Sequence, residues 1–175
     1  TELADLTLGL IGCGNIGQRV AAAASALGMR VIAHTPHHHD DTDTVKFVPL
    51  ETLLAESDAI SLHCPLSDAT RGMVNAAMIE RMKDGAYLIN TSRGAVLNEA
   101  DVAAALNSGK LAGAALDVLA VEPALPENPL LTAKNCIITP HIAWASKASR
   151  ERLLAVIAAS MDSYAKTGTG LNRIV

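Results

Sequence analysis

Short apolar runs alternate with amphipathic or alanine-rich segments along the chain, and the two kinds of segment predict strands and helices respectively. Strands are predicted over residues 6–11, 30–34, 59–64, 86–91, 112–118 and 136–140. Helices are predicted over residues 16–27, 49–56, 76–82, 99–107 and 150–166. Strands that alternate with helices at this spacing are typical of βαβ units, so we expect an α/β fold with a doubly wound parallel sheet flanked by helices.

The residues at the ends of these helices support their boundaries. Gly28, Gly85 and Gly109 follow predicted helices, where a residue free to adopt positive φ ends a helix at little cost. Asn98 stands at a predicted N-cap, and the charge of Asp101 three residues on suits the helix dipole. Since there is no internal repeat and no low-complexity linker, residues 1–150 are expected to form one domain.

The composition narrows the class of protein. Half of the residues are hydrophobic but only 2% are aromatic, which suits parallel strands buried on both faces by alanine-rich helices. A net charge of −4 without a Lys/Arg run argues against nucleic acid as a partner. No apolar run approaches the roughly 20 residues that cross a membrane, and the N-terminus is unlike a signal peptide. Three scattered cysteines lack metal-site spacing, so we expect reduced thiols in a cytoplasmic protein.

The first predicted strand runs directly into GCGNIG, which contains Gly12, Gly14 and Gly17. Such glycines allow a tight turn, close approach of the backbone to a pyrophosphate, and close packing of the next helix, whose N-terminal N–H groups attract the anion. The strand before and the helix after distinguish this pattern from a glycine-rich turn without a ligand. The sequence therefore predicts a Rossmann-type dinucleotide site.

Three further side chains follow strands at the same predicted edge of the sheet. Arg93, Glu122 and His141 come after the fourth, fifth and sixth predicted strands. Ligands of open α/β sheets bind beyond the carboxyl ends of the strands, so we expect the three residues to converge opposite the glycine turn. Taken singly, they also fit a surface arginine, an exposed acid and a histidine satisfied by its neighbours.

The chemistry of these three residues suits the reduction of a 2-keto acid. The planar guanidinium of Arg93 can bind a carboxylate through two hydrogen bonds. The imidazole of His141 can exchange a proton near neutral pH, and a hydrogen bond donated by that ring to the Glu122 carboxylate would orient it. With a nicotinamide as hydride donor, His141 would protonate the developing alkoxide.

Four segments, GCGNIG, NTSRGAVLNE, ALDVLAVEP and TPHIAWAS, occur in an order that resembles the D-isomer-specific 2-hydroxyacid dehydrogenase family over nearly the whole chain. PHIAWAS is similar to its glycerate dehydrogenase (hydroxypyruvate reductase) branch. The resemblance implies that Arg93 binds the substrate carboxylate and carbonyl. It also implies that His141, paired to Glu122, is the acid/base. Trp144 is expected either to contact the substrate or only to close the pocket. The implied cofactor-binding residues are Gly12, Gly14, Asn15, Ile16, Gly17, Thr35, Cys64, Pro65, Thr91 and Asp117, the last contacting the nicotinamide carboxamide.

One departure from the family pattern concerns length. Family members carry a substrate domain of about 100 residues or more before the glycine turn, whereas this sequence begins almost at the first strand. We therefore expect a cofactor-domain fragment, in which residues 151–175 form a final helix and the start of a return to the absent domain. Dinucleotide binding would survive, while catalysis would be weak or absent because that domain closes over the nicotinamide.

Another departure lies at the end of the second strand, where dinucleotide-binding folds place an acid that accepts the ribose hydroxyls and repels a 2′-phosphate. Thr35 occupies this place and carries no charge. No arginine stands nearby to favour NADP, although the histidines at 37–39 offer partial positive charge. Asp40, Asp41 and Asp43 would oppose a phosphate. We expect a relaxed site that binds NAD first and tolerates NADP.

The histidine triplet itself is interpreted as a solvated turn rather than a metal site. Consecutive residues on a regular element cannot all face one ion, which argues against three ligands from this run. No metal is therefore included among the expected cofactors.

The sequence leaves a choice between an enzyme and a binding protein. The enzyme would reversibly reduce hydroxypyruvate or glyoxylate to the D-2-hydroxy acid, and the sequence does not separate these substrates. The alternative is a redox-sensing, corepressor-like protein of the same fold that binds NADH with little turnover. The nearly featureless acidic composition favours the enzyme. The family resemblance also implies a homodimer built largely from this domain.

Overall fold

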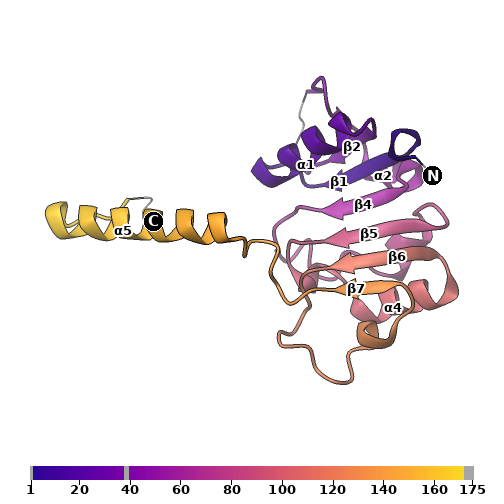
Figure 1. The fold of residues 1–175 in the computed structure, drawn as a ribbon. Helices are drawn as coiled ribbons and strands as arrows, with labels where there is room; N and C mark the ends of the chain where they lie inside the picture. The colour runs from indigo at the N-terminus through magenta and orange to yellow at the C-terminus, as the bar shows by residue number, and fades with distance from the viewer. Residues whose placement is uncertain (1, 38–39, 172–175) are drawn as a thin grey trace. The chain divides into compact units, whose positions relative to one another are not determined.

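The computed structural model describes residues 2–37 and 40–171, which belong to two compact units (Figure 1). Unit 1 spans Thr1–Pro140 and holds the sheet, and unit 2 spans His141–Val175 and holds a long helix. Unit 1 ends before the domain boundary expected at residue 150. Because the positions of the two units relative to one another are not determined, each is described by itself.

Within the described residues, unit 1 is built on a seven-stranded parallel sheet in the order β3-β2-β1-β4-β5-β6-β7. Figure 1 shows β4, β5 and β6 side by side with their arrowheads at the same end. The strands are β1 Thr7–Ile11, β2 Arg30–His34, β3 Lys46–Phe47, β4 Ala59–Leu62, β5 Ala86–Asn90, β6 Leu111–Leu116 and β7 Cys136–Ile138. This order confirms the doubly wound sheet. From β1 the chain adds strands toward one edge, to β3, and from β4 it adds them toward the other edge, to β7. Such sheets bind their ligands at the point between β1 and β4 where this order reverses.

The predicted strands are confirmed with small shifts at their ends, but β3 was missed. It consists of Lys46 and Phe47 alone, which is too short to show an alternating pattern. It pairs with β2 at the edge of the sheet, where Phe47 lies opposite Ala33. Tertiary pairing rather than local sequence makes this segment a strand.

The predicted helices are also confirmed. They are α1 Asn15–Ala26, α2 Leu50–Glu56, α3 Ala76–Glu80, α4 Glu99–Ser108 and, in unit 2, α5 Lys147–Thr167. Asn98 caps α4 by accepting a hydrogen bond from the Asp101 amide at 3.3 Å, and Gly109 ends that helix with a φ of +85°. Short 3-10 turns that the sequence did not predict lie at Leu3–Asp5, Gly94–Val96 and Pro129–Thr132.

Successive strand side chains point to opposite faces of the sheet and bury two apolar clusters. On one face, Leu8 and Leu10 of β1 pack with Ala21 and Ala24 of α1. On the other face, a larger cluster joins the strands to α2, α3 and α4. Its fully buried strand residues include Ile32, Ile60, Leu62, Leu88 and Leu116. Aliphatic side chains therefore form this core, as the low aromatic content predicts.

Beside α1, the sheet carries an apolar hollow of about 1040 Å³, called here the apolar sheet face. It is lined mainly by small and apolar side chains of β4, β5, β6 and β7. Tyr87 and Ile137, which belong to this lining, are 54% and 68% exposed. Exposed apolar surface of this extent is typical of a face that another part of a protein or another copy covers.

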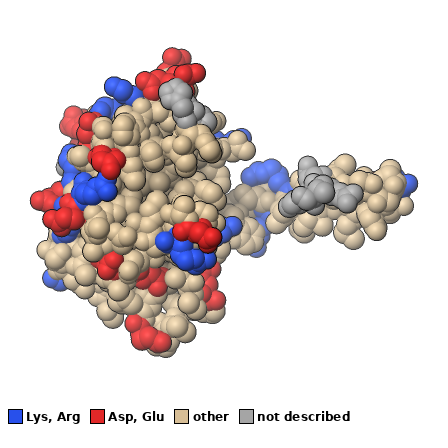
Figure 2. All heavy atoms as spheres, turned by 180° about the vertical axis from the view of Figure 1, so that it is seen from behind, with Lys and Arg blue, Asp and Glu red and all other residues tan. Residues whose placement is uncertain are grey.

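Acidic and basic side chains are interspersed on the face of unit 1 drawn in Figure 2. That face shows no broad basic patch of the kind that nucleic-acid binding requires. Among the described residues, no helix is long and apolar enough to cross a membrane.

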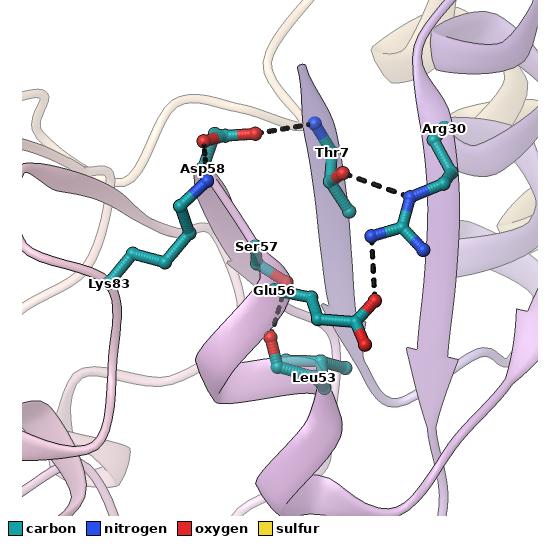
Figure 3. A network of polar contacts seen from close by, with 7 residues as sticks. All are labelled: Thr7, Arg30, Leu53, Glu56, Ser57, Asp58 and Lys83. Carbon is teal, nitrogen blue, oxygen red and sulfur yellow. Dashed lines mark hydrogen bonds and ion pairs between the residues drawn. The ribbon is translucent and has the colours of Figure 1, made fainter.

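A polar network joins the amino ends of β1, β2 and β4 (Figure 3). The Asp58 carboxylate accepts hydrogen bonds from the Thr7 amide, at 2.8 Å, and from the Lys83 ammonium. The Arg30 guanidinium donates to the Thr7 hydroxyl at 3.1 Å and pairs with Glu56 at 2.7 Å. Burial acts to raise the pKa of Asp58, but the hydrogen bonds from Lys83 and Thr7 outweigh it, so this pKa is lowered.

Candidate functional site

The turn after β1 requires glycine at two positions. Gly12 has a φ of +92°, and a Cβ there would lie 2.7 Å from the backbone nitrogen of Cys64. A Cβ on Gly17 would lie 2.8 Å from the carbonyl oxygen of Gly12. Gly12 therefore allows the tight turn against the end of β4, and Gly17 allows α1 to pack closely on that turn.

Gly14 differs from these two because a Cβ there would meet nothing within 4 Å. It is the N-cap of α1, and it offers no side chain to the first N–H groups of the helix, on Asn15, Ile16 and Gly17. Open space at the positive end of a helix dipole suits the pyrophosphate of a dinucleotide. These residues therefore fit the cofactor that the glycine pattern predicts.

A pocket of about 460 Å³, the central pocket, lies at the carboxyl ends of β4 and β5 beside the start of α1. Its lining contains five residues that the sequence predicts at the site: Ile16, Cys64, Pro65, Thr91 and Arg93. It also contains three that sequence reasoning missed: His63, Leu66 and Ser92. The sequence could have indicated these three residues only through their position, because each is adjacent to a predicted site residue that follows a strand.

His63 is a half-buried polar residue of the central pocket. Its Nε2 lies 3.0 Å from the Ser61 hydroxyl oxygen, and its backbone packs against Gly12. Burial lowers the pKa of this imidazole and favours its neutral form. Burial likewise raises the pKa of the neighbouring Cys64 thiol and favours its protonated form. These two side chains therefore present an uncharged surface beside the glycine turn at neutral pH.

The buried side chain of Asn90 shapes the turn that presents Arg93. Its Nδ2 donates to the Arg93 carbonyl at 2.9 Å, and its Oδ1 accepts from the Ser92 amide and hydroxyl at 2.9 and 2.8 Å. The exposed Arg93 guanidinium donates to the Ser92 carbonyl at 2.7 Å. A guanidinium carries five N–H donors, so this bond leaves capacity for a carboxylate.

The Arg93 turn packs against the loop that carries Glu122. A Cβ on Gly94 would lie 1.9 Å from the Leu119 carbonyl carbon, so any side chain there would force the two segments apart. The Glu122 carboxylate accepts a hydrogen bond from the Leu119 amide at 2.9 Å. Arg93 and Glu122 thus come from adjacent segments at the same edge of the sheet.

Glu99, in the first turn of α4, anchors the same loop. Its Oε1 accepts from the Ala120 amide at 2.8 Å, and its Oε2 accepts from the Asn128 side chain at 3.0 Å. Sequence reasoning missed this role, because the helix dipole alone already accounts for an acid in a first turn. Glu99 therefore ties the two sides of the Glu122 loop to the helix.

Asp117 follows β6 and is buried, with 6% of its surface exposed. The Thr139 hydroxyl donates to its Oδ1, which links the ends of β6 and β7. Asp117 therefore lies at the edge of the sheet where the sequence expects it. Its contact with a nicotinamide carboxamide stays a prediction.

His141 and Trp144 belong to unit 2, so the structure does not place them relative to Arg93 and Glu122. Within that unit, His141 has a φ of +53°, and the Trp144 indole donates to the His141 carbonyl at 2.9 Å. Trp144 thereby holds the backbone of the histidine, a role that the sequence did not predict. The convergence of the three catalytic candidates stays a prediction.

A second pocket, of about 590 Å³, lies at the carboxyl end of β2 and is called here the β2 pocket. The Gly12 amide donates to the His34 carbonyl at 2.9 Å, so the glycine turn adjoins this strand end. Folds of this kind place the adenosine ribose there. The lining residues are Ala33, His34, Thr35, Pro36, His37, Asp40, Asp41, Phe47, Val48 and Pro49.

The histidine triplet lies partly outside the described residues, which do not include His38 and His39. Within the part of the chain that is described, no group of three or more His, Cys, Asp or Glu side chains could hold a metal ion. The interpretation of the triplet as a solvated turn stays a prediction.

Residues 1–143 match the family model described as "D-isomer specific 2-hydroxyacid dehydrogenase, NAD binding domain". A hydroxypyruvate reductase of Blautia hydrogenotrophica is 47% identical over 167 residues, which are 94% of this chain and 52% of that protein. The chain spans about half the length of the curated relatives it matches.

Solved structures give a similar match. The D-isomer specific 2-hydroxyacid dehydrogenase of Lactobacillus delbrueckii ssp. bulgaricus, in its NAD-complexed form, is 34% identical with a TM-score of 0.89, covering 98% of this chain and 58% of that one. An acyclic imino acid reductase (Bsp5), in complex with NADPH and D-Arg, is 33% identical with a TM-score of 0.87, covering 100% of this chain and 55% of that one. The two similar structures thus contain different nicotinamide cofactors.

Proposed function

Because this chain belongs to the D-isomer-specific 2-hydroxyacid dehydrogenase family, we propose that it binds a nicotinamide dinucleotide, NAD before NADP, and carries the catalytic residues of a reductase. The reaction is the reversible reduction of a small 2-keto acid, hydroxypyruvate or glyoxylate, to the D-2-hydroxy acid. The similarity to a hydroxypyruvate reductase supports this substrate class. It also favours the enzyme over a redox-sensing, corepressor-like protein.

The observation that carries the proposal is the central pocket at the uncapped start of α1. Gly12 and Gly17 build the turn, and Gly14 leaves the space that a pyrophosphate needs at the helix N-terminus. The same pocket is lined by Thr91 and Arg93 at the end of β5. Ile16, in the first turn of α1, lines this pocket together with the proposed substrate arginine, so the pocket adjoins the helix start proposed to bind the pyrophosphate.

Each proposed catalytic residue has its own task. Arg93 binds the substrate carboxylate and polarises the carbonyl through its N–H donors. His141 donates a proton to the carbonyl oxygen as that atom becomes an alkoxide, and it removes the proton in the reverse reaction. Glu122 orients the imidazole, and the Trp144 side chain closes one side of the substrate pocket. When bound, the dinucleotide supplies or accepts the hydride.

Gly14→Asp tests the dinucleotide site while preserving the fold. Aspartate is a favoured N-cap residue and the space around Gly14 admits a Cβ, so α1 should remain as stable as in the wild type. The added carboxylate would occupy the anion site and repel the pyrophosphate. We therefore expect the NADH affinity, measured by calorimetric titration, to fall by at least about 100-fold.

Gly14→Ala is the matched control, because it adds a Cβ at the same position without charge. It should lose much less NADH affinity than Gly14→Asp. Equal NADH affinity in the wild type and in Gly14→Asp would contradict the proposed site.

The proposal includes a homodimer in the cytoplasm. The apolar sheet face is a surface that a second copy would bury, as in oligomers whose interfaces resemble a protein core. Cys13, Cys64 and Cys136 are free thiols, which suits a reducing compartment.

A further inference from the structure

We propose that Asp41 takes the place of the missing acid at the end of β2 and makes the site select NAD over NADP. The inference rests on the proposed function, because it concerns the cofactor of that site. Thr35 stands where a carboxylate is expected, so any strong selectivity must come from another group in the β2 pocket.

Thr35 is insufficient by itself. Its hydroxyl donates to the His37 carbonyl at 2.7 Å and is thereby held within its own turn. The hydroxyl oxygen can still accept a hydrogen bond from a ribose, but it has no charge with which to repel a 2′-phosphate. A site that relied on Thr35 alone would bind both dinucleotides with similar affinity.

Asp41 lines the same pocket and is held by the edge of the sheet. One of its oxygens, Oδ1, accepts from the Phe47 amide of β3 at 2.7 Å. Thr42 closes the following turn, where its amide donates to the Val45 carbonyl at 2.9 Å and its hydroxyl oxygen accepts from the Val45 amide at 3.0 Å. A carboxylate has about four acceptor sites, so an anchored Asp41 can also accept from ribose hydroxyls.

The other described groups of the β2 pocket support the same selectivity. Asp40 adds a second carboxylate to the lining, and neither Lys nor Arg is among the described lining residues. His34 Nδ1 lies 3.2 Å from the Val48 carbonyl, so this nitrogen carries a hydrogen that is bonded to the backbone. A 2′-phosphate would bring nearly two negative charges toward these carboxylates, whereas ribose hydroxyls would donate to them.

The test compares the dissociation constants of NADH and NADPH for the wild type and for Asp41→Asn by calorimetric titration. Asparagine has nearly the same shape and keeps an oxygen that accepts from the Phe47 amide, while it removes the charge and replaces the other oxygen with an NH2 group. The wild type should prefer NADH, and the ratio of the NADPH to the NADH dissociation constant should fall about tenfold in Asp41→Asn, mainly through tighter NADPH binding. Asp43→Asn, an exposed acid of the same segment outside the pocket lining, is the matched control and should leave the ratio unchanged.

Salt provides a second measurement that needs no variant. Because the selectivity is electrostatic, the same ratio in the wild type should shrink as the salt concentration rises. If the wild type binds NADH and folded Asp41→Asn has the same ratio as the wild type, this inference alone is overturned. If the variant does not fold, a wild-type ratio that does not change with salt overturns the inference in the same way. If the wild type binds neither dinucleotide, the proposed function is overturned and this inference with it.

Discussion

Arg93 and Glu122 are oriented by backbone groups close to them in the sequence. Arg93 donates to the Ser92 carbonyl, and Glu122 accepts from the Leu119 amide. A backbone hydrogen bond restrains a charged side chain and does not neutralise its charge, whereas an ion pair with an opposite charge would neutralise it. Arg93 therefore retains its positive charge for the carboxylate of a substrate.

Substitution of Arg93 or of His141 by alanine distinguishes the two proposed tasks, which are substrate binding and proton transfer. Arg93→Ala should raise the KM for hydroxypyruvate and lower kcat, because carboxylate binding and carbonyl polarisation are lost together. His141→Ala should lower kcat by about 10²–10⁴-fold, the usual contribution of a general acid, with little change in NADH affinity. Steady-state oxidation of NADH, in a form of the protein that turns over hydroxypyruvate, measures both effects.

Arg81→Ala is the control for these variants, because Arg81 is an exposed arginine that pairs with Glu51 on α2 and is not part of the central pocket lining. Its kinetic constants should equal those of the wild type. Wild-type kinetics in both Arg93→Ala and His141→Ala would contradict the proposed roles.

Among the elements, the strand order brings together segments that are distant in the sequence. Gly94 packs against the Leu119 backbone because β5 and β6 are neighbours in the sheet. Glu99 then ties the Glu122 loop to α4. The elements themselves were predictable because alternation and helix caps are local signals. These contacts were not, because they depend on which loops the sheet places side by side.

Asp58→Asn tests the network at the amino ends of the strands. The pKa of Asp58 is lowered in the folded protein, so its ionised form stabilises the fold. That contribution is present above the unfolded-state pKa of about 3.9 and is lost as the pH falls through the lower folded-state pKa. We expect Asp58→Asn to reduce the free energy of unfolding by about 1–3 kcal/mol at neutral pH, and by less in acid.

Urea unfolding at neutral pH and in acid measures this difference. Asp84→Asn is the control, because the Asp84 side chain pairs with Lys110 but is 91% exposed, and it should cost well under about 1 kcal/mol. An equal loss of stability for Asp58→Asn at both pH values would be inconsistent with the lowered pKa.

In the molecule as a whole, each unit leaves apolar side chains exposed. In unit 1 these include Tyr87 and Ile137 of the apolar sheet face. In unit 2, α5 has no buried residue among those described, and Leu154 and Met161 are 66% and 68% exposed. Such surfaces are costly for an isolated domain, which supports the proposed homodimer.

Ile137→Lys tests whether a second copy covers the apolar sheet face. Ile137 is exposed on β7, so lysine there should leave the fold of one chain intact but place a charge in the proposed interface. Light scattering should give the mass of two chains for the wild type and of one chain for Ile137→Lys. Leu125→Lys, at an exposed apolar residue outside that face, should remain a dimer. A monomeric wild type would exclude the proposed dimer under those conditions.

The sequence by itself determined the order of strands and helices, the glycine turn and the types of residue at the candidate site. These depend on side-chain alternation, on caps such as Asn98, and on backbone geometry that only glycine tolerates at Gly12. The tertiary structure alone decided that Lys46–Phe47 is a strand, that Glu99 holds the Glu122 loop, and that Asp41 shares a pocket with Thr35. The physical reason is that such features depend on hydrogen bonds and packing between segments that only the folded sheet brings into contact.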